Sequence, residues 1–172
     1  MELKKLNSDL RNDAISFGLC AQWQGDWEND WDREKLVAKM YQGMDFCLKY
    51  RYPSKQFILD NFEQEFRRKS CVLVDDKYSL LNPQNALLLG NSESTIRMNA
   101  HNSATIYMRD ESRVKLLASG LSFVIVHLLE SAQVEVETKD KAHVVVITHS
   151  KFASLISGCQ DVVYKEEYDW LK

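Results

Sequence analysis

The stretch SATIYMRDESRVKLLASGLSFVIVHLLESAQVEVETKDKAHVVVIT, residues 103–148, decides the fold because it repeats every ten residues. Within each unit the apolar side chains alternate along the chain, which is the period of a β-strand with one buried face. Small residues and turn formers separate the units, and a register of this kind is typical of stacked structural repeats. The central aliphatic positions are Ile96, Ile106, Leu116, Val126, Val136, Val146 and Ile156, and a weaker leading unit lies at Ala86 and Leu88.

Ten residues per unit fit either a strand with a hairpin turn or a strand with one bend of a β-solenoid. Tight hairpins favour Asn-Gly, Asp-Gly or Gly-Gly at the turn. Among the junctions of the repeat, only Ser119-Gly120 contains glycine. The turn chemistry therefore favours a solenoid, and an antiparallel meander or barrel stays as the alternative.

The outward-facing positions follow a longer period of twenty residues. Alternate units are mostly polar, as at Thr95, Lys115 and Glu135. A solenoid with two strands per coil would stack these units on one solvated face, with Lys115 beside Glu135 at about the 4.8 Å strand spacing. The other units would form an apolar strip, which needs a cover. The strip residues are Tyr107, Ile125, His127, Val145 and Ile147.

Residues 1–70 have helical periodicity and supply the obvious cover. Three helices are expected, each with apolar side chains at steps of three and four residues. The expected N-caps are Asn7-Ser8-Asp9, Asp32 and Ser54, and the expected last apolar positions are Trp23, Leu48 and Phe66. The basic triplet Arg67-Arg68-Lys69 would end the third helix, where cations suit the helix dipole.

The fold prediction is therefore an α+β protein with three parts. A helical region, residues 1–70, packs on a β-solenoid of about three and a half coils, residues 71–160. Residues 161–172 form a charged, aromatic tail that caps the trailing end or serves in self-association. Such a cap matters because open strand edges invite aggregation.

Composition narrows the class of protein. The chain has 172 residues, of which 45% are hydrophobic and 27% charged, and its net charge is −3. These values exclude a disordered chain, a collagen-like chain and a disulfide scaffold, and they argue against general nucleic-acid binding. No apolar run is long enough for a membrane span, and the start, Met1 to Asn7, has no apolar signal core. A cytoplasmic protein is expected, with its four cysteines as buried, reduced thiols.

The chain resembles uncharacterised bacterial proteins, some of them associated with phages or mobile elements, that place a short helical region before β-repeats. The resemblance adds to the expectation for the fold and implies no activity, ligand or site. The matching stretches are Leu10-Arg11 through Ala14-Ile15, Gly18-Leu19-Cys20, Trp23, Asn82-Pro83, Ile106-Tyr107-Met108-Arg109 and Ser112-Arg113-Val114.

The sequence contains none of the common phosphate-binding, zinc-protease or serine-hydrolase motifs. No catalytic residue, cofactor or metal site is predicted. Glu135 and Glu137 lie on one strand face, where paired carboxylates can do acid–base work. Because Lys115 is expected beside them, an exposed ion-pair ladder is the favoured interpretation.

Two clusters of rings are candidates for packing or interaction. Trp23, Trp27 and Trp31 recur every four residues and would share one face of a helix. They would either pin the helices to the apolar strip or form a stacking platform for a sugar, base or peptide. His127 is expected between Tyr107 and Ile147 as a packed or interface residue.

The favoured functional hypothesis is a non-enzymatic structural or protein-interaction module that binds another protein or a second copy. A carbohydrate- or small-ligand-binding module using the tryptophans is the first alternative. A polysaccharide hydrolase with a groove site that includes Glu135 is the second.

Overall fold

The computed structural model describes residues 3–28, 31–155 and 161–164, and the chain divides into two compact units after Glu63. The division falls after Glu63 and not after residue 70, because the helix α6 (Gln64–Lys69) contacts the first strand and belongs with the sheets. The predicted packing of helices on the apolar strip concerns both units and stays a prediction.

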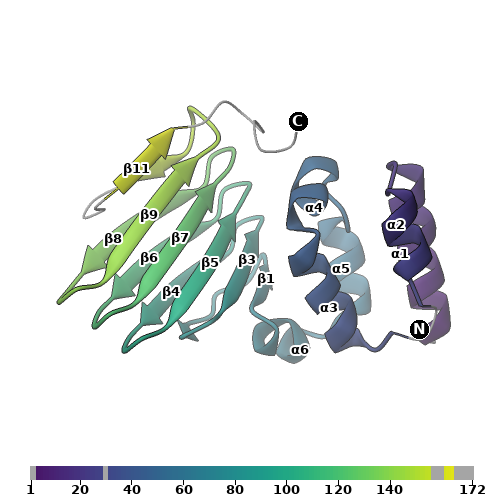
Figure 1. Ribbon diagram of the computed structural model, residues 1–172, viewed down its shortest axis with the longest axis horizontal. Coiled ribbons are helices and arrows are strands. Elements are labelled where there is room, and N and C mark those ends of the chain that lie inside the picture. Colours follow the sequence, from purple (N-terminus) through teal and green to yellow (C-terminus); the bar gives the residue numbers. More distant parts are fainter. Residues whose placement is uncertain (1–2, 29–30, 156–160, 165–172) are drawn as a thin grey trace. The chain divides into compact units, whose positions relative to one another are not determined.

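The first unit consists of short helices joined by capped turns (Figure 1). Two predicted N-caps are confirmed. The Asp32 side chain accepts from the Lys35 amide at 2.7 Å, and the Ser54 hydroxyl accepts from the Phe57 amide at 3.1 Å. The helices are α1 (Leu3–Ser16), α2 (Ala21–Asp26), α3 (Arg33–Gln42), α4 (Met44–Tyr50) and α5 (Lys55–Asn61).

The helix boundaries differ from the prediction in four places. The first predicted helix, which was expected to reach Trp23, is divided into α1 and α2. Asn7 is no cap, because α1 begins at Leu3; its buried amide donates to the carbonyl oxygens of Leu3 and Trp31 at 3.0 and 2.7 Å. Gly43 divides the second predicted helix into α3 and α4. Phe62 adopts an extended backbone and divides the third into α5 and α6. Apolar periodicity continues across each break, so periodicity alone could not locate it.

The second unit is a β-solenoid, as predicted, with about four turns where about three and a half coils were expected, and every strand pair among its described residues is parallel. Parallel pairing excludes the antiparallel meander or barrel. Sheet A has the order β1-β3-β5-β7-β9-β11 and sheet B has the order β10-β8-β6-β4-β2 (Figure 1). The strands are β1 (Val72–Val74), β2 (Leu80–Leu81), β3 (Asn85–Leu89), β4 (Glu93–Met98), β5 (Ser103–Met108), β6 (Arg113–Ala118), β7 (Phe123–Leu128), β8 (Gln133–Thr138), β9 (His143–Thr148), β10 (Ser154–Leu155) and β11 (Asp161–Tyr164).

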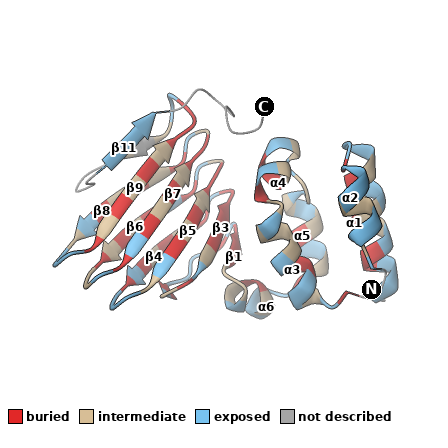
Figure 2. Ribbon diagram, viewed as in Figure 1, coloured by how far each residue is buried: buried red, intermediate tan, exposed pale blue. Residues whose placement is uncertain are grey.

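The predicted twenty-residue register is confirmed from β3 to β9. Ile106 pairs with Val126 and Val126 with Val146 in sheet A, while Ile96 pairs with Leu116 and Leu116 with Val136 in sheet B. All of these side chains are fully buried between the sheets. The alternation of buried residues with more exposed ones along β4 to β9 is visible in Figure 2. Burial of this continuous aliphatic column is the main favourable term for the unit.

The turns between strands depend on one left-handed residue per unit. This residue lies four positions after the central aliphatic, where the sequence shows turn formers. The positive φ angles are those of Gly90, Ala100, Asp110, Gly120, Glu130 and Asp140. In two places an aspartate also binds the coil before it: the Gly90 amide donates to Asp110 Oδ2 at 2.6 Å, and the Gly120 amide donates to Asp140 Oδ2 at 3.0 Å.

Gly120→Ala is expected to destabilise the solenoid by about 1–3 kcal/mol. Gly120 has φ +71°, and a Cβ there would lie 2.8 Å from the Ala100 carbonyl oxygen. Urea unfolding measures the effect. Gly25→Ala is the control, because Gly25 lies in a helix and a Cβ there meets nothing within 4 Å. An equal loss in both variants would contradict the turn argument.

The regular repeat ends after β9. Ser154 and Leu155 pair with Gln133 and Val134, which is one residue out of the predicted register, and Ile156 lies outside the described residues. The turn at Ser150 causes the slip, since the Ser150 hydroxyl and carbonyl oxygens accept from the Phe152 and Ala153 amides. The predicted tail begins with β11, which pairs with β9; residues 165–172 of that tail are outside the described part of the chain.

The cysteines differ in burial, whereas all four were predicted to be buried. Cys47 is buried and Cys71 is half-buried, and burial raises the pKa of the Cys71 thiol. Cys20 is exposed, which corrects the expectation of a buried thiol, because α1 ends at Ser16 and Cys20 is the N-cap of α2. Cys159 lies outside the described residues. No described helix has both the length and the apolar character needed to cross a bilayer.

Candidate functional site

The outer faces of the two sheets differ in chemistry, as the twenty-residue pattern predicts. Sheet A carries the apolar strip, and sheet B carries rows of polar side chains in register across the strands. One row runs from Glu93 through Arg113 to Gln133, and the next runs from Thr95 through Lys115 to Glu135. Parallel strands place such residues about 4.8 Å apart, so a row forms a ladder of polar groups.

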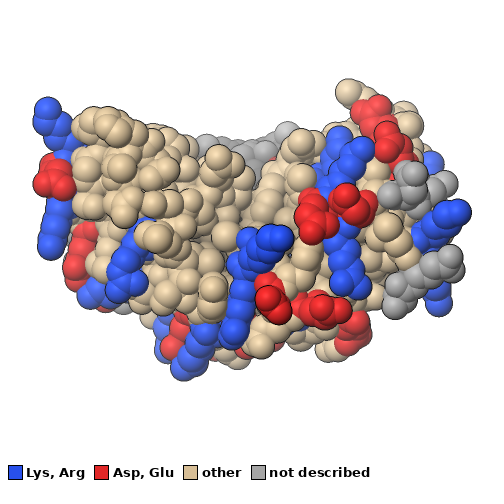
Figure 3. All heavy atoms as spheres, turned by 90° about the horizontal axis from the view of Figure 1, so that it is seen from below, with Lys and Arg blue, Asp and Glu red and all other residues tan. Residues whose placement is uncertain are grey.

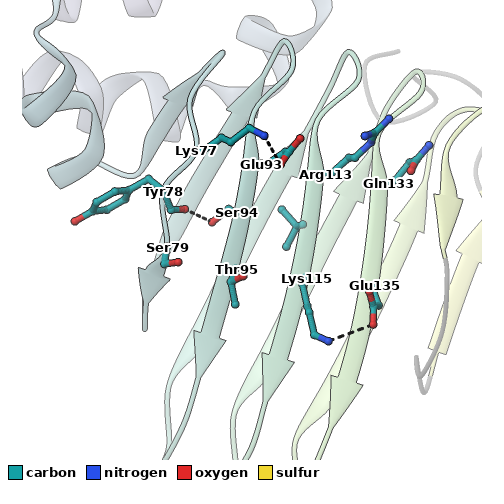
Figure 4. A pocket seen from close by; sticks show the side chains of 11 residues that line it. Lys77, Tyr78, Ser79, Glu93, Ser94, Thr95, Arg113, Lys115, Gln133 and Glu135 are labelled. Carbon is teal, nitrogen blue, oxygen red and sulfur yellow. Dashed lines mark hydrogen bonds and ion pairs between the residues drawn. The ribbon is translucent and has the colours of Figure 1, made fainter.

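These ladders line a groove of about 790 Å³ on sheet B (Figure 4). The groove crosses β4, β6 and β8 and begins at the segment before β2. It is lined by Lys77, Tyr78, Ser79, Glu93, Ser94, Thr95, Arg113, Val114, Lys115, Gln133 and Glu135.

Ion pairs hold most of the charges in the groove. Lys115 Nζ lies 3.4 Å from Glu135 Oε1 and 2.6 Å from Glu137 Oε1. Both carboxylates raise the pKa of Lys115, Glu137 most strongly. Lys77 Nζ lies 2.9 Å from Glu93 Oε2 at the other end of the groove. The predicted ladder of Lys115 with the two glutamates is therefore present, and each of these carboxylates already has an ammonium partner.

Arg113 is the exception among the basic residues of the groove. Its side chain is exposed, and within the described part of the chain no carboxylate lies within 4 Å of it. The same holds for Arg97, which lies on β4 of the same sheet but outside the groove lining. Arg113 thus offers its donors to the groove.

Tyr78 forms the leading end of the groove. Its side chain is 42% exposed, and the guanidinium carbon of Arg68 lies 4.8 Å from the ring centroid. The Ser94 hydroxyl donates to the Tyr78 carbonyl oxygen at 2.7 Å and fixes the backbone there. The Tyr78 backbone therefore borders the polar row, and its ring extends outward from the leading end of the groove (Figure 4).

The five strip residues lie together on the outer face of sheet A, as predicted, and all are half-buried. Tyr107 stacks on His127 with ring centroids 5.0 Å apart. The next ring in the stack is His149, whose centroid lies 5.3 Å from that of His127. Its Nε2 is 3.0 Å from His127 Nδ1. His149 joins this stack because it directly follows β9.

The three tryptophans also come together, but within the first unit and not along one helix. Trp23 lies in α2, Trp27 follows that helix, and Trp31 precedes α3. Trp27 and Trp31 stack with centroids 5.0 Å apart, and Lys39 Nζ lies 5.2 Å from the Trp23 ring and 5.4 Å from the Trp31 ring. Trp31 is only 2% exposed, so its ring packs against neighbours and offers no open platform.

The sequence alone did not identify Tyr78, Arg113 and Gln133 as members of a common surface. The signal was the register itself: extending the twenty-residue step from Glu93 meets Arg113 and Gln133 in turn. On the face drawn in Figure 3, lysine and arginine side chains lie among acidic ones and form no single basic patch.

Comparison with protein-family models, with curated proteins and with solved structures found no match to the chain. The site is therefore interpreted from its own geometry.

Proposed function

We propose that the protein is a non-enzymatic, cytoplasmic protein-interaction module that pairs with a second copy of itself through β11, the trailing strand of sheet A. The observation that carries this proposal is the exposure of residues that the solenoid elsewhere buries. Strand edges with free backbone groups are templates for pairing with another chain.

The register identifies the exposed residues as part of the core column. Val162 pairs with Val146, which is fully buried, so both belong to the inward-facing set. Val162 is nevertheless 37% exposed, and Tyr164, in the same set, is 80% exposed. Figure 2 shows β11 as the exposed strand at this end of the sheet. A further strand stacked on β11 would cover these side chains as β9 covers those of β7.

A second copy fits this end because it presents the same edge. Two β11 strands related by a two-fold axis would pair antiparallel, with identical residues on both sides of the interface. At the leading edge of sheet A, by contrast, α6 contacts β1. Tail-to-tail pairing is therefore the geometry favoured by the described strands. Because β11 has only four residues, we expect the association to depend on protein concentration.

Light scattering coupled to size-exclusion chromatography, over a range of protein concentrations, tests the proposal. The wild type should approach the mass of a dimer as concentration rises. Val162→Lys should remain a monomer, because a charge at the edge opposes burial. Leu121→Lys is the matched control, since Leu121 is a 51% exposed aliphatic in a turn, and it should dimerise like the wild type.

A wild type that stays monomeric at all concentrations overturns self-association. If a protein of the native host then binds the wild type and Leu121→Lys but not Val162→Lys, the edge accepts a different polypeptide. Equal association of the wild type and both variants would show that β11 is not the interface.

A further inference from the structure

We propose that the groove on sheet B is a binding site for a carbohydrate chain lying across the strands. This inference concerns a different surface from β11 and does not depend on pairing between copies. It rests on the shape of the groove, the order of its polar groups and the ring at its leading end.

The order of the groups suits a polymer with regularly spaced hydroxyls. A chain that crosses β4, β6 and β8 meets Glu93, Arg113 and Gln133 in turn. The Glu93 carboxylate accepts hydrogen bonds, the Arg113 guanidinium donates them, and the Gln133 amide both donates and accepts. These side chains project side by side from neighbouring strands in Figure 4. Each hydroxyl of a sugar is both a donor and an acceptor, so it can bind every member of this row.

The charge balance favours a sugar over a polyanion. Lys77 is paired with Glu93, and Lys115 lies between Glu135 and Glu137, so carboxylates lie beside both ammonium groups. A nucleic acid or another dense polyanion would meet these carboxylates along with the cations. A surface of mixed donors and acceptors with little net charge instead suits a hydroxyl-rich ligand.

Tyr78 supplies the apolar part of the site. Sugar rings have apolar faces that pack on aromatic rings, and the partly exposed Tyr78 ring extends outward beyond the leading end of the polar row (Figure 4). Arg68 lies over the Tyr78 ring and holds it in place against the solenoid. The groove is about 790 Å³ and open to solvent along the row, which suits a segment of polymer more than an enclosed small molecule.

Affinity electrophoresis of the full chain through gels containing soluble polysaccharides tests the proposal. The panel includes the uncharged polysaccharides dextran, xylan, mixed-linkage β-glucan and galactomannan, with dextran sulfate as the polyanion. At least one of the first four should retard the wild type. Arg113→Ala should weaken that binding about tenfold or more, because it removes charged donors. Tyr78→Ala should also weaken it.

Arg97→Ala is the matched control. It removes the same side chain from the same sheet, also without an ion-pair partner among the described residues, but outside the groove. It should change binding less than twofold. Circular dichroism of each variant confirms that the fold is retained.

No retardation by any of the four polysaccharides overturns the proposal. Equal weakening by Arg113→Ala and Arg97→Ala, or retardation by dextran sulfate alone, overturns it as well, since binding would then follow charge and not the groove. Val162→Lys should bind polysaccharide like the wild type, so failure of the groove and failure of the β11 proposal are separate results.

Discussion

Val126→Asp is expected to unfold or aggregate the solenoid unit. Val126 is fully buried and lies between Ile106 and Val146 in the central column of sheet A. A carboxylate there has no polar partner, and burying it costs several kcal/mol, as does burying its neutral form. Since the free energy of unfolding of such domains is only about 5–15 kcal/mol, the substitution removes most of that stability. Far-UV circular dichroism and thermal melting measure the loss of the sheet.

Glu137→Ala is the control for this result. The Glu137 side chain is 48% exposed on sheet B, and Lys115 keeps Glu135 as a partner when Glu137 is removed. An exposed ion pair contributes little, so the free energy of unfolding should change by no more than about 0.5 kcal/mol. If the chain tolerated both substitutions equally, the register that places Val126 inside and Glu137 outside would be incorrect.

The sequence predicted the solenoid because its signal is redundant. Each inward position recurs every ten residues, so the register from β3 to β9 rests on many independent side chains. At the ends this redundancy is lost. The one-residue shift in the pairing of Ser154 comes from the local turn that Ser150 holds. No further ten-residue unit follows among the described residues, so the sequence pattern contains no sign of this shift.

The helices and the surface groove were harder to predict for physical reasons. An apolar face continues smoothly from α3 into α4, so Gly43 breaks the helix without any change in periodicity. The tryptophans recur at helical spacing but lie on three different segments, because short helices can bring such residues together through turns. Tyr78 lies outside the repeat, and only the fold places it in the lining of the same groove as Glu93 and Arg113.

Asp76→Asn is expected to lower the free energy of unfolding by about 2–3 kcal/mol. The Asp76 side chain is 5% exposed and accepts from Arg68 Nε and Nη2 at 2.9 and 2.8 Å. It also accepts from the Gln64 side chain and the Lys77 amide. These bonds join α6 to the first coil. A neutral amide loses the ionic partner of Arg68 and turns a donor group toward its guanidinium. Urea unfolding of the variant and the wild type measures the difference.

The pH dependence of the same pair gives a second measurement. Hydrogen bonds from Arg68, with smaller contributions from its charge, from Lys77 and from Gln64, hold the pKa of Asp76 below its ordinary value. The unfolded chain binds this proton at about pH 3.9, so the stabilisation is fully present above that pH and is lost as pH falls through the lower folded value. The gap in unfolding free energy between wild type and Asp76→Asn should therefore be constant near neutrality and narrow on acidification below about pH 4. A gap that is unchanged down to pH 2–3 would show that the Asp76 carboxylate does not stabilise the fold through Arg68.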